Sequence, residues 1–377
     1  MLSYIIKGIM KVYNQNSLVN LSNSILKNFH CETFHDTIPE IDAILKGHKK
    51  VVAVLFDGMG RNITRKHLKE DSFIRKHYVT TINSTYPPTT AAATTAFLTG
   101  RYPIETGWLG WNLYFKELDR NVILFKNQDY NTEEYLNEPY SYRKFPITPI
   151  FQIIESNNKN IKALPIQRFP IQQDGPKYLM RSGVNKLNKV LKENDECFIY
   201  FYWDSPDCEM HENGIDSKKV HYQVLKAQRF MERVTKDNPD TLFILLADHG
   251  HINVEFFDIC KHDDIYSLID KPLSLEKRTI SFFVKEGKKE EFVTLFNKYY
   301  GQYFELLSKE EALNIKLFGE GNMAPGVYDS IGDYIAISHD KYGIVASKEL
   351  QKPDKFKGHH AGGTEEERLI DIAIFNR

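Results

Sequence analysis

The sequence predicts an α/β fold in which a mostly parallel central sheet carries helices on both faces. Three runs, "KKVVAVLF", "CFIYFYW" and "TLFILLA", are apolar at successive positions, which is typical of strands buried on both faces. A helical pattern from Lys218 to Asp237 separates the second run from the third, and alternating strands and helices favour a parallel sheet. Acidic residues follow each run, at the strand ends where such sheets bind ligands.

Residues 1–45 precede the sheet as an expected helical extension. Apolar side chains recur there at helical spacing, at Leu18, Leu21, Ile25 and Phe29. The opening stretch "MLSYIIKGIMKVYNQN" has a short apolar run broken by Lys7 and no small-x-small cleavage site. It therefore makes a poor signal peptide.

The composition indicates a globular chain with one large core or two modest ones, since 42% of its 377 residues are hydrophobic and 26% are charged. A formal net charge of −1 gives no overall field that would attract nucleic acid or an anionic membrane. No run approaches the roughly 18 apolar residues that a membrane span needs. Four cysteines are scattered without a C-x-x-C motif, which fits a reducing compartment. We therefore expect a cytoplasmic protein.

The sequence changes character from about Cys260. The segment "KRTISFFVKEGKKEEFVTLFNKYYGQYFELLSKEEALNIKLFG" is predicted as strand, helix, strand, helix and carries none of the Asp/His clusters. We expect a small inserted α+β cap at 261–321, within a catalytic core formed by 46–260 and 322–377. The chain closes on "KGHHAGGTEEERLIDIAIF", where His360 lies in a Gly-rich loop before a final strand.

Six carboxylates and imidazoles outside the cap lie at strand ends or beside Gly or Pro: Asp57, Asp207, His211, Asp248, His249 and His360. Asp207 and His211 are four residues apart, so a helical turn places both on one face. Gly250 allows the chain to leave the strand after Asp248 and His249, so that both can reach one ion. Oxygen and nitrogen ligands without cysteine suit two divalent ions, zinc or manganese, with positions open for substrate.

The stretch "YPPTTAAATTAFLTG" offers a nucleophile for such a site. Pro87 and Pro88 end the preceding strand, and Thr90 begins a predicted helix whose amino end favours a phosphoryl group. A threonine hydroxyl becomes nucleophilic when a metal or a base deprotonates it. Thr90 is therefore the candidate catalytic residue.

These motifs resemble the alkaline phosphatase superfamily, and specifically its type I phosphodiesterase/nucleotide pyrophosphatase branch. The ordered matches are "FDGMG", Thr90 before "TGRYP", "PDCEMH", "ADHG" and "GHHAG", across residues 50–363. The resemblance implies one metal ion on Asp57, Thr90, Asp248 and His249, and a second ion on Asp207, His211 and His360. His359 stays open as the alternative to His360.

The resemblance implies hydrolysis of phosphate esters, most of all phosphodiesters or nucleotide-type substrates, through a covalent phosphothreonine at Thr90. The alternatives are a phosphomonoesterase, a phosphonate hydrolase, a phosphomutase or a non-catalytic metal-binding relative. Sulfatases need a C/S-x-P-x-R motif, which the sequence lacks. The family's asparagine three residues after the nucleophile is Ala93 here, so we expect the backbone amide of Ala91 to stabilise the phosphoryl oxygen.

Three further side chains are candidates for substrate contacts. Arg101 can reach a phosphate or form a surface salt bridge. Trp108 and Trp111 can stack on a nucleobase or aryl group, or belong to the core.

Overall fold

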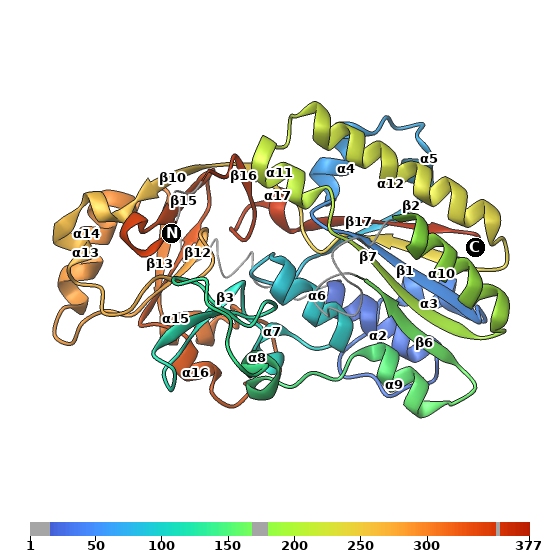
Figure 1. The fold of residues 1–377 in the computed structure, drawn as a ribbon, viewed down its shortest axis with the longest axis horizontal. Helices are drawn as coiled ribbons and strands as arrows, with labels where there is room; N and C mark the ends of the chain where they lie inside the picture. Colours follow the sequence, from blue (N-terminus) through green and yellow to red (C-terminus); the bar gives the residue numbers. More distant parts are fainter. Residues whose placement is uncertain (1–15, 168–179, 352–354) are drawn as a thin grey trace.

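The computed structural model of the chain describes residues 16–167, 180–351 and 355–377. Its central sheet has six strands in the order β2-β17-β8-β1-β7-β6 (Figure 1). The three apolar runs form β1 (Lys50–Phe56), β7 (Cys197–Trp203) and β8 (Leu242–Leu246), which lie next to one another and are parallel. The predicted α/β class with a mostly parallel sheet is confirmed.

The outer strands complete this sheet. β6 (Lys162–Ile166) is parallel to β7, whereas β17 (Leu369–Phe375) is antiparallel to both β8 and β2 (Tyr78–Asn83). The final strand expected after the Gly-rich loop is β17. Its antiparallel direction returns the chain across the sheet, so that the loop before it lies at the carboxyl ends of β1 and β8.

Helices cover both faces of the sheet (Figure 1). One layer contains α2 (Leu18–Asn28), α3 (Pro39–Leu45), α6 (Thr90–Thr99) and α9 (Ile150–Asn157). The other contains α4 (Arg61–His67), α5 (Phe73–Lys76), α10 (Met180–Glu193), α11 (Asp207–Asn213) and α12 (Lys218–Asp237). The helix expected from Leu18 is α2. Residues 1–15, which hold most of the opening stretch, lie outside the described residues.

A second sheet of seven strands lies beside the first, in the order β13-β14-β12-β11-β3-β4-β5, and its pairings are antiparallel. The predicted strand, helix, strand, helix segment forms β12 (Thr279–Phe282), α14 (Lys289–Tyr300), β13 (Phe304–Ser308) and α15 (Lys309–Asn314). Other strands come from inside and outside 261–321: β3 (Asn112–Phe115), β4 (Arg120–Ile123), β5 (Gln128–Asp129), β11 (Ser274–Leu275) and β14 (Tyr334–Ser338).

Short elements connect these layers. Two small pairings join β10 (Glu255–Asp258) with β15 (Tyr342–Val345), and β16 (Gly358–His359) with β9 (Ile252–Asn253). The remaining helices are α7 (Pro103–Thr106), α8 (Tyr140–Lys144), α13 (Asp263–Tyr266), α16 (Val327–Ser330), α17 (Glu365–Arg368), η1 (Ile259–Lys261) and η2 (Ser347–Glu349). Within the described ranges, none of the helices combines the length and the apolar composition needed to span a bilayer.

Candidate active site

The predicted metal ligands converge where the central strands end. Asp57 directly follows β1, Asp248 follows β8, and Asp207 begins α11 after β7. Because parallel strands end at the same edge of a sheet, the three carboxylates come together there. In Figure 1 this edge faces the second sheet, with α6 and α11 between the two sheets. All three side chains are buried.

Thr90 lies at the start of α6 and points into this cluster. Its Oγ1 is 3.4 Å from Asp57 Oδ1 and 3.2 Å from His249 Nε2. The whole of α6 is buried, which explains its run of Ala and Thr, since small side chains allow close packing on every face. Ala91 follows Thr90 in the first turn of α6. The N–H groups of a first helical turn have no partner within the helix.

His249 bridges the two carboxylates of the first group, which comprises Asp57, Thr90, Asp248 and His249. Its Nε2 is 3.4 Å from Asp57 Oδ1 and 3.4 Å from Asp248 Oδ2. Its Nδ1 is 2.9 Å from the Gly250 carbonyl oxygen, so this nitrogen donates and Nε2 keeps its lone pair for the cluster. Asp248 Oδ2 is buried without a hydrogen-bond partner among the described residues.

The second group comprises Asp207, His211, His251 and His360. As expected from the four-residue spacing on α11, His211 Nε2 lies 3.3 Å from Asp207 Oδ2. His360 Nε2 lies 3.8 Å from Asp207 Oδ1. The Nδ1 atoms of His211 and His360 lie 3.0 and 3.2 Å from the carbonyl oxygens of Gly358 and Pro88. Both imidazoles therefore turn Nε2 towards the carboxylate.

The donor separations fit metal ions better than hydrogen bonds. Most contacts within the two groups measure 3.2–3.4 Å, which is long for a hydrogen bond to a charged group. Donor atoms on one tetrahedral zinc ion lie about 3.3 Å apart, because Zn–N and Zn–O bonds are about 2.0–2.1 Å long. The residues present therefore fit two divalent ions, and the unpartnered Asp248 oxygen gains a ligand role.

The charges of the buried carboxylates lead to the same conclusion. Burial raises the pKa of Asp57 well above its ordinary value, and the neighbouring Asp248 and Asp207 raise it further. Burial also raises the pKa of Asp248 to about 7. Burial alone would raise the pKa of Asp207, but His211 outweighs it and holds this pKa well below its ordinary value. The protein by itself therefore does not stabilise two ionised carboxylates in the first group, and a bound cation would favour their ionised forms.

Burial leaves two of the imidazoles neutral. It lowers the pKa of His251 to about 4 and that of His360 well below its ordinary value. Burial also acts to lower the pKa of His211, but the Asp207 carboxylate raises it. Neutral imidazole is the form that binds a metal ion, so His251 and His360 are in the binding form at neutral pH.

Glycines allow the backbone segments to approach this closely. Gly58, which follows Asp57, has φ +71°, a conformation that side chains rarely adopt. A Cβ on Gly250 would lie 1.9 Å from the Glu366 carbonyl oxygen. These positions explain the glycines of "FDGMG" and "ADHG" in physical terms.

Tyr202 binds one of the two oxygens of the Asp57 carboxylate. Its hydroxyl, buried at the end of β7, donates a hydrogen bond to Asp57 Oδ2. Asp57 Oδ1 is the oxygen nearer to Thr90 and His249. The tyrosine thus orients the carboxylate and takes up the oxygen through which it could bind a further cation.

Two buried charged residues in the turn between β11 and β12 contact segments of the site. Glu276 Oε1 accepts hydrogen bonds from Thr89 Oγ1 at 2.5 Å and from the Trp111 amide at 2.7 Å. Arg278 pairs with Glu367, with Nε 2.8 Å from Oε1, and both side chains are fully buried. Thr89 precedes Thr90, and Glu367 follows the loop that carries His360.

The candidate substrate contacts fall in different places. Arg101 lies at the opposite end of α6 from Thr90, 3.4 Å from Glu105 and over the ring of Phe34. The expectation that Arg101 binds a phosphate is therefore corrected, and the alternative of a salt bridge holds. Trp108 is fully buried in the hydrophobic cluster against the second sheet. The expectation that it stacks on substrate is therefore corrected, and the alternative of a core residue holds.

Two more candidates lie closer to the site. The Trp111 side chain is partly exposed, and its amide is bound to Glu276. His359 is buried beside His360, and its Nδ1 accepts a hydrogen bond from the His360 amide at 2.9 Å. The second donor group contains His360 and not His359.

Sequence reasoning missed four residues of the site: Tyr202, His251, Glu276 and Arg278. His251 follows "DHG" directly, so its position next to this motif could have indicated a further candidate ligand. The other three act through long-range contacts that local sequence does not encode.

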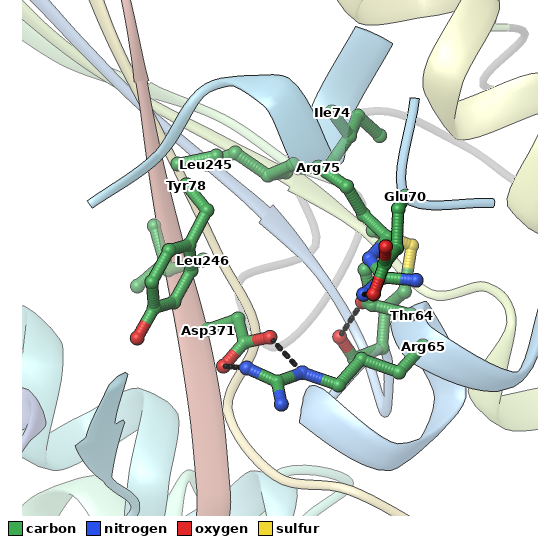
Figure 2. Close-up of a pocket in the computed structure, with 11 residues that line it drawn as sticks. Thr64, Arg65, Glu70, Ile74, Arg75, Tyr78, Leu245, Leu246 and Asp371 are labelled. Atoms are coloured by element: carbon green, nitrogen blue, oxygen red, sulfur yellow. Dashed lines mark hydrogen bonds and ion pairs between the residues drawn. The ribbon is translucent and has the colours of Figure 1, made fainter. Parts of the chain in front are cut away.

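A cavity of about 220 Å³ lies elsewhere, between α4, α5 and the strands β8 and β17 (Figure 2). The Arg65–Asp371 ion pair, at 2.9 Å, lies along its wall. The cavity shares no residue with either donor group. The chemistry therefore identifies the metal-ligand cluster, and not this cavity, as the candidate active site.

Comparisons with known proteins agree with this assignment. The profile of the family described as type I phosphodiesterase / nucleotide pyrophosphatase matches residues 51–362. The fold is similar to that of murine ectonucleotide pyrophosphatase / phosphodiesterase 5, solved as an inactive variant in complex with AMP, with 16% identity, a TM-score of 0.63, and coverage of 86% of this chain and 87% of that one. The human protein of the same name gives 14% identity and a TM-score of 0.65, with the same coverage. No curated protein matches the sequence.

Proposed function

Because the chain belongs to the type I phosphodiesterase / nucleotide pyrophosphatase family and is thereby a metal-dependent phosphoric ester hydrolase, we propose that it cleaves phosphodiesters or nucleotide-type esters with Thr90 as nucleophile. The observation that carries this proposal is the Thr90 hydroxyl at the start of α6, 3.2 Å from His249 Nε2 and 3.4 Å from Asp57. A hydroxyl surrounded by metal-ligating groups is placed for activation and not for structural capping.

The proposed chemistry has two steps at Thr90. The Thr90 oxygen attacks phosphorus, the bond from phosphorus to the leaving oxygen breaks, and the leaving group departs as an alcohol after taking up a proton. Water then cleaves the phosphothreonine, which restores the Thr90 hydroxyl and releases a phosphate monoester from a diester substrate. The Ala91 amide, at the amino end of α6, donates to a phosphoryl oxygen in both steps.

We assign one ion to Asp57, Thr90, Asp248 and His249, and the other to Asp207, His211 and His360. Zinc is the preferred metal and manganese is the alternative. When bound, two divalent ions lower the pKa of a hydroxyl nucleophile and stabilise charge on the leaving oxygen. Asp57, held by Tyr202, and His249, held by the Gly250 carbonyl, orient the Thr90 side of the site.

The surroundings of Thr90 support a diester preference. No Lys or Arg lies between Tyr78 and Gly100, and Asp57 Oδ2 is bonded to the neutral Tyr202 hydroxyl. A monoester dianion would find no cationic side chain on the segment around Thr90 for its additional charge, whereas a diester monoanion would not need one. The AMP bound to the murine structural relative supports a nucleotide-type substituent.

The test compares para-nitrophenyl phosphate with a para-nitrophenyl phosphodiester on one zinc-loaded preparation. We expect a higher kcat/KM for the diester, and a loss of at least about 10³-fold in turnover for Thr90→Ala. Thr99→Ala, on the same buried helix and bonded to the Thr95 carbonyl, is the matched control and should retain activity. A clear monoester preference would refute the diester proposal, and an active Thr90→Ala variant would refute the nucleophile.

We also propose a cytoplasmic location. The support is that all four cysteines are free thiols, with only Cys208 exposed. Fractionation of cells that express the full chain tests this point.

A further inference from the structure

His251 is a buried imidazole that the proposed ligand sets do not use. It lies two residues after His249, immediately before β9, and its side chain is fully buried. Its Nδ1 has no hydrogen-bond partner among the described residues, and its Nε2 makes only a long approach of 3.3 Å to Asp207 Oδ1. A buried polar group without a partner is costly and calls for an explanation.

The position of the ring supplies that explanation. His251 Nε2 lies 3.3 Å from Asp207 Oδ1, and His211 Nε2 lies 3.3 Å from the other oxygen of the same carboxylate. Both separations equal the distance of about 3.3 Å between two donors on one tetrahedral zinc ion. His360, which is an expected ligand, lies farther from Asp207, at 3.8 Å.

The three imidazoles of this group also face one another at steep angles. The rings of His211 and His251 are 4.7 Å apart with an interplanar angle of 76°, and those of His251 and His360 are 5.4 Å apart at 69°. Stacked rings would direct their nitrogens away from a common point. The steep angles instead suit imidazoles that converge on one ion from different directions.

We propose that His251 is a fourth protein ligand of the ion held by Asp207, His211 and His360. This inference rests on the two-metal site of the proposed function and extends it. Three imidazoles and one carboxylate favour zinc, whereas the Thr90 site has two carboxylates, a hydroxyl and one imidazole, a set that accepts manganese more readily. The two sites should therefore differ in metal preference, with zinc retained at the His251 site.

His251→Gln separates a ligand from a hydrogen-bonding residue. The glutamine amide nitrogen takes the place of Nε2 and can still donate to Asp207, but it does not replace an imidazole ligand. His359→Asn is the matched control, because His359 is a buried neighbour outside the donor group and the asparagine oxygen can accept from the His360 amide as Nδ1 does. Thermal unfolding of the zinc-loaded variants establishes that each is folded.

The measurements are X-ray absorption of the zinc-loaded protein and zinc retention against a competing chelator. We expect four imidazoles shared by two zinc ions in the wild type, three in His251→Gln, and four in His359→Asn. We also expect His251→Gln to weaken zinc retention at one site by at least about 10-fold to 100-fold. Cobalt-substituted protein should show a changed visible absorption spectrum only for His251→Gln.

Two results would overturn the inference. If His251→Gln keeps four imidazoles or the wild-type zinc retention, His251 acts only by hydrogen bonding to Asp207, and the two-metal proposal stands. If the wild type binds no zinc, manganese or cobalt, the proposed function fails together with this inference.

Discussion

Removing the guanidinium of Arg278 should destabilise the protein strongly. Arg278 and Glu367 are both fully buried, and Arg278 donates to both carboxylate oxygens, at 2.8 and 3.0 Å. It also donates to the carbonyl oxygens of Tyr342 and Asp340, at 2.7 and 2.8 Å. Arg278→Met leaves a buried carboxylate without its counter-charge, and breaking a buried ion pair in this way costs about 3–5 kcal/mol.

The remaining partners of Glu367 place the effect within that range. The Gly362 amide at 2.7 Å and the Thr364 hydroxyl at 2.8 Å still donate to Glu367 in the variant, so its charge is not left entirely unsatisfied. The carbonyl oxygens of Tyr342 and Asp340 lose the guanidinium, but the Ser338 hydroxyl stays within 2.6 and 2.9 Å of them, so they add little to the loss. The expected loss of about 3–5 kcal/mol is a large fraction of a typical unfolding free energy of about 5–15 kcal/mol.

Urea unfolding at fixed excess zinc measures this loss, because a constant ligand concentration keeps the binding contribution comparable. The double variant Arg278→Met/Glu367→Gln removes both charges and should recover at least about 2 kcal/mol of the loss. Burial acts to raise the pKa of Glu367, but Arg278 and its hydrogen bonds hold that pKa below the ordinary 4.5. The pair's contribution is therefore fully present above pH 4.5 and is lost as the pH falls through the lower folded-state pKa. A loss under about 1 kcal/mol for Arg278→Met, or no recovery in the double variant, would refute this reasoning.

Three other perturbations test separate parts of the site. Asp248→Ala and His211→Ala should each leave about one zinc ion per chain by elemental analysis, since they belong to different donor groups; retention of both ions by either variant contradicts the ligand sets. Burial raises the pKa of Glu276 from 4.5 to about 7, so ionisation of this carboxyl opposes folding. In urea titrations, the unfolding free energy of the wild type should therefore decline relative to that of Glu276→Gln as the pH rises from 4.5 to 7, and a constant difference would contradict that pKa. Lys277 Nζ lies 4.4 Å from the Phe356 ring, and that ring is 4.6 Å from the His211 ring. Lys277→Ala should therefore raise KM for a substrate with an anionic leaving group about 2-fold to 5-fold and leave kcat nearly constant; an unchanged KM argues against a contact between Lys277 and the leaving group.

The central sheet and the convergence of most candidate metal ligands could be predicted because their signals are local. A strand buried on both faces must be apolar at successive positions, and β1, β7 and β8 satisfy this within seven residues or fewer. The spacing of Asp207 and His211 follows from one helical turn. Asp57 and Asp248 come together because parallel strands share an edge, a rule that needs no knowledge of distant contacts.

The second sheet could not be predicted in the same way, because its pairings join distant segments. Leu275 pairs with Asn112, and Ile280 pairs with Ala336. Strands of two to five residues carry too few positions to show a period. Charged side chains are rarely buried unless they are paired, so local sequence offered no reason to expect Glu276 and Arg278 in the interior, where both lie. Their partners Thr89 and Glu367 lie 187 and 89 residues away.

The turn between β11 and β12 explains how two distant segments of the core keep one geometry. Glu276 holds Thr89, next to the nucleophile, and Arg278 holds Glu367, after the His360 loop. Because these anchors are two residues apart on one turn, they help to fix the offset between Thr90 and His360, together with the direct contacts of His360 Nδ1 and the Ala361 amide with the Pro88 carbonyl oxygen. Both anchors are buried, so a shift of this turn would disturb both ends together and would break the buried Arg278–Glu367 ion pair. The second sheet is therefore part of the framework that sets the distance between Thr90 and the second donor group.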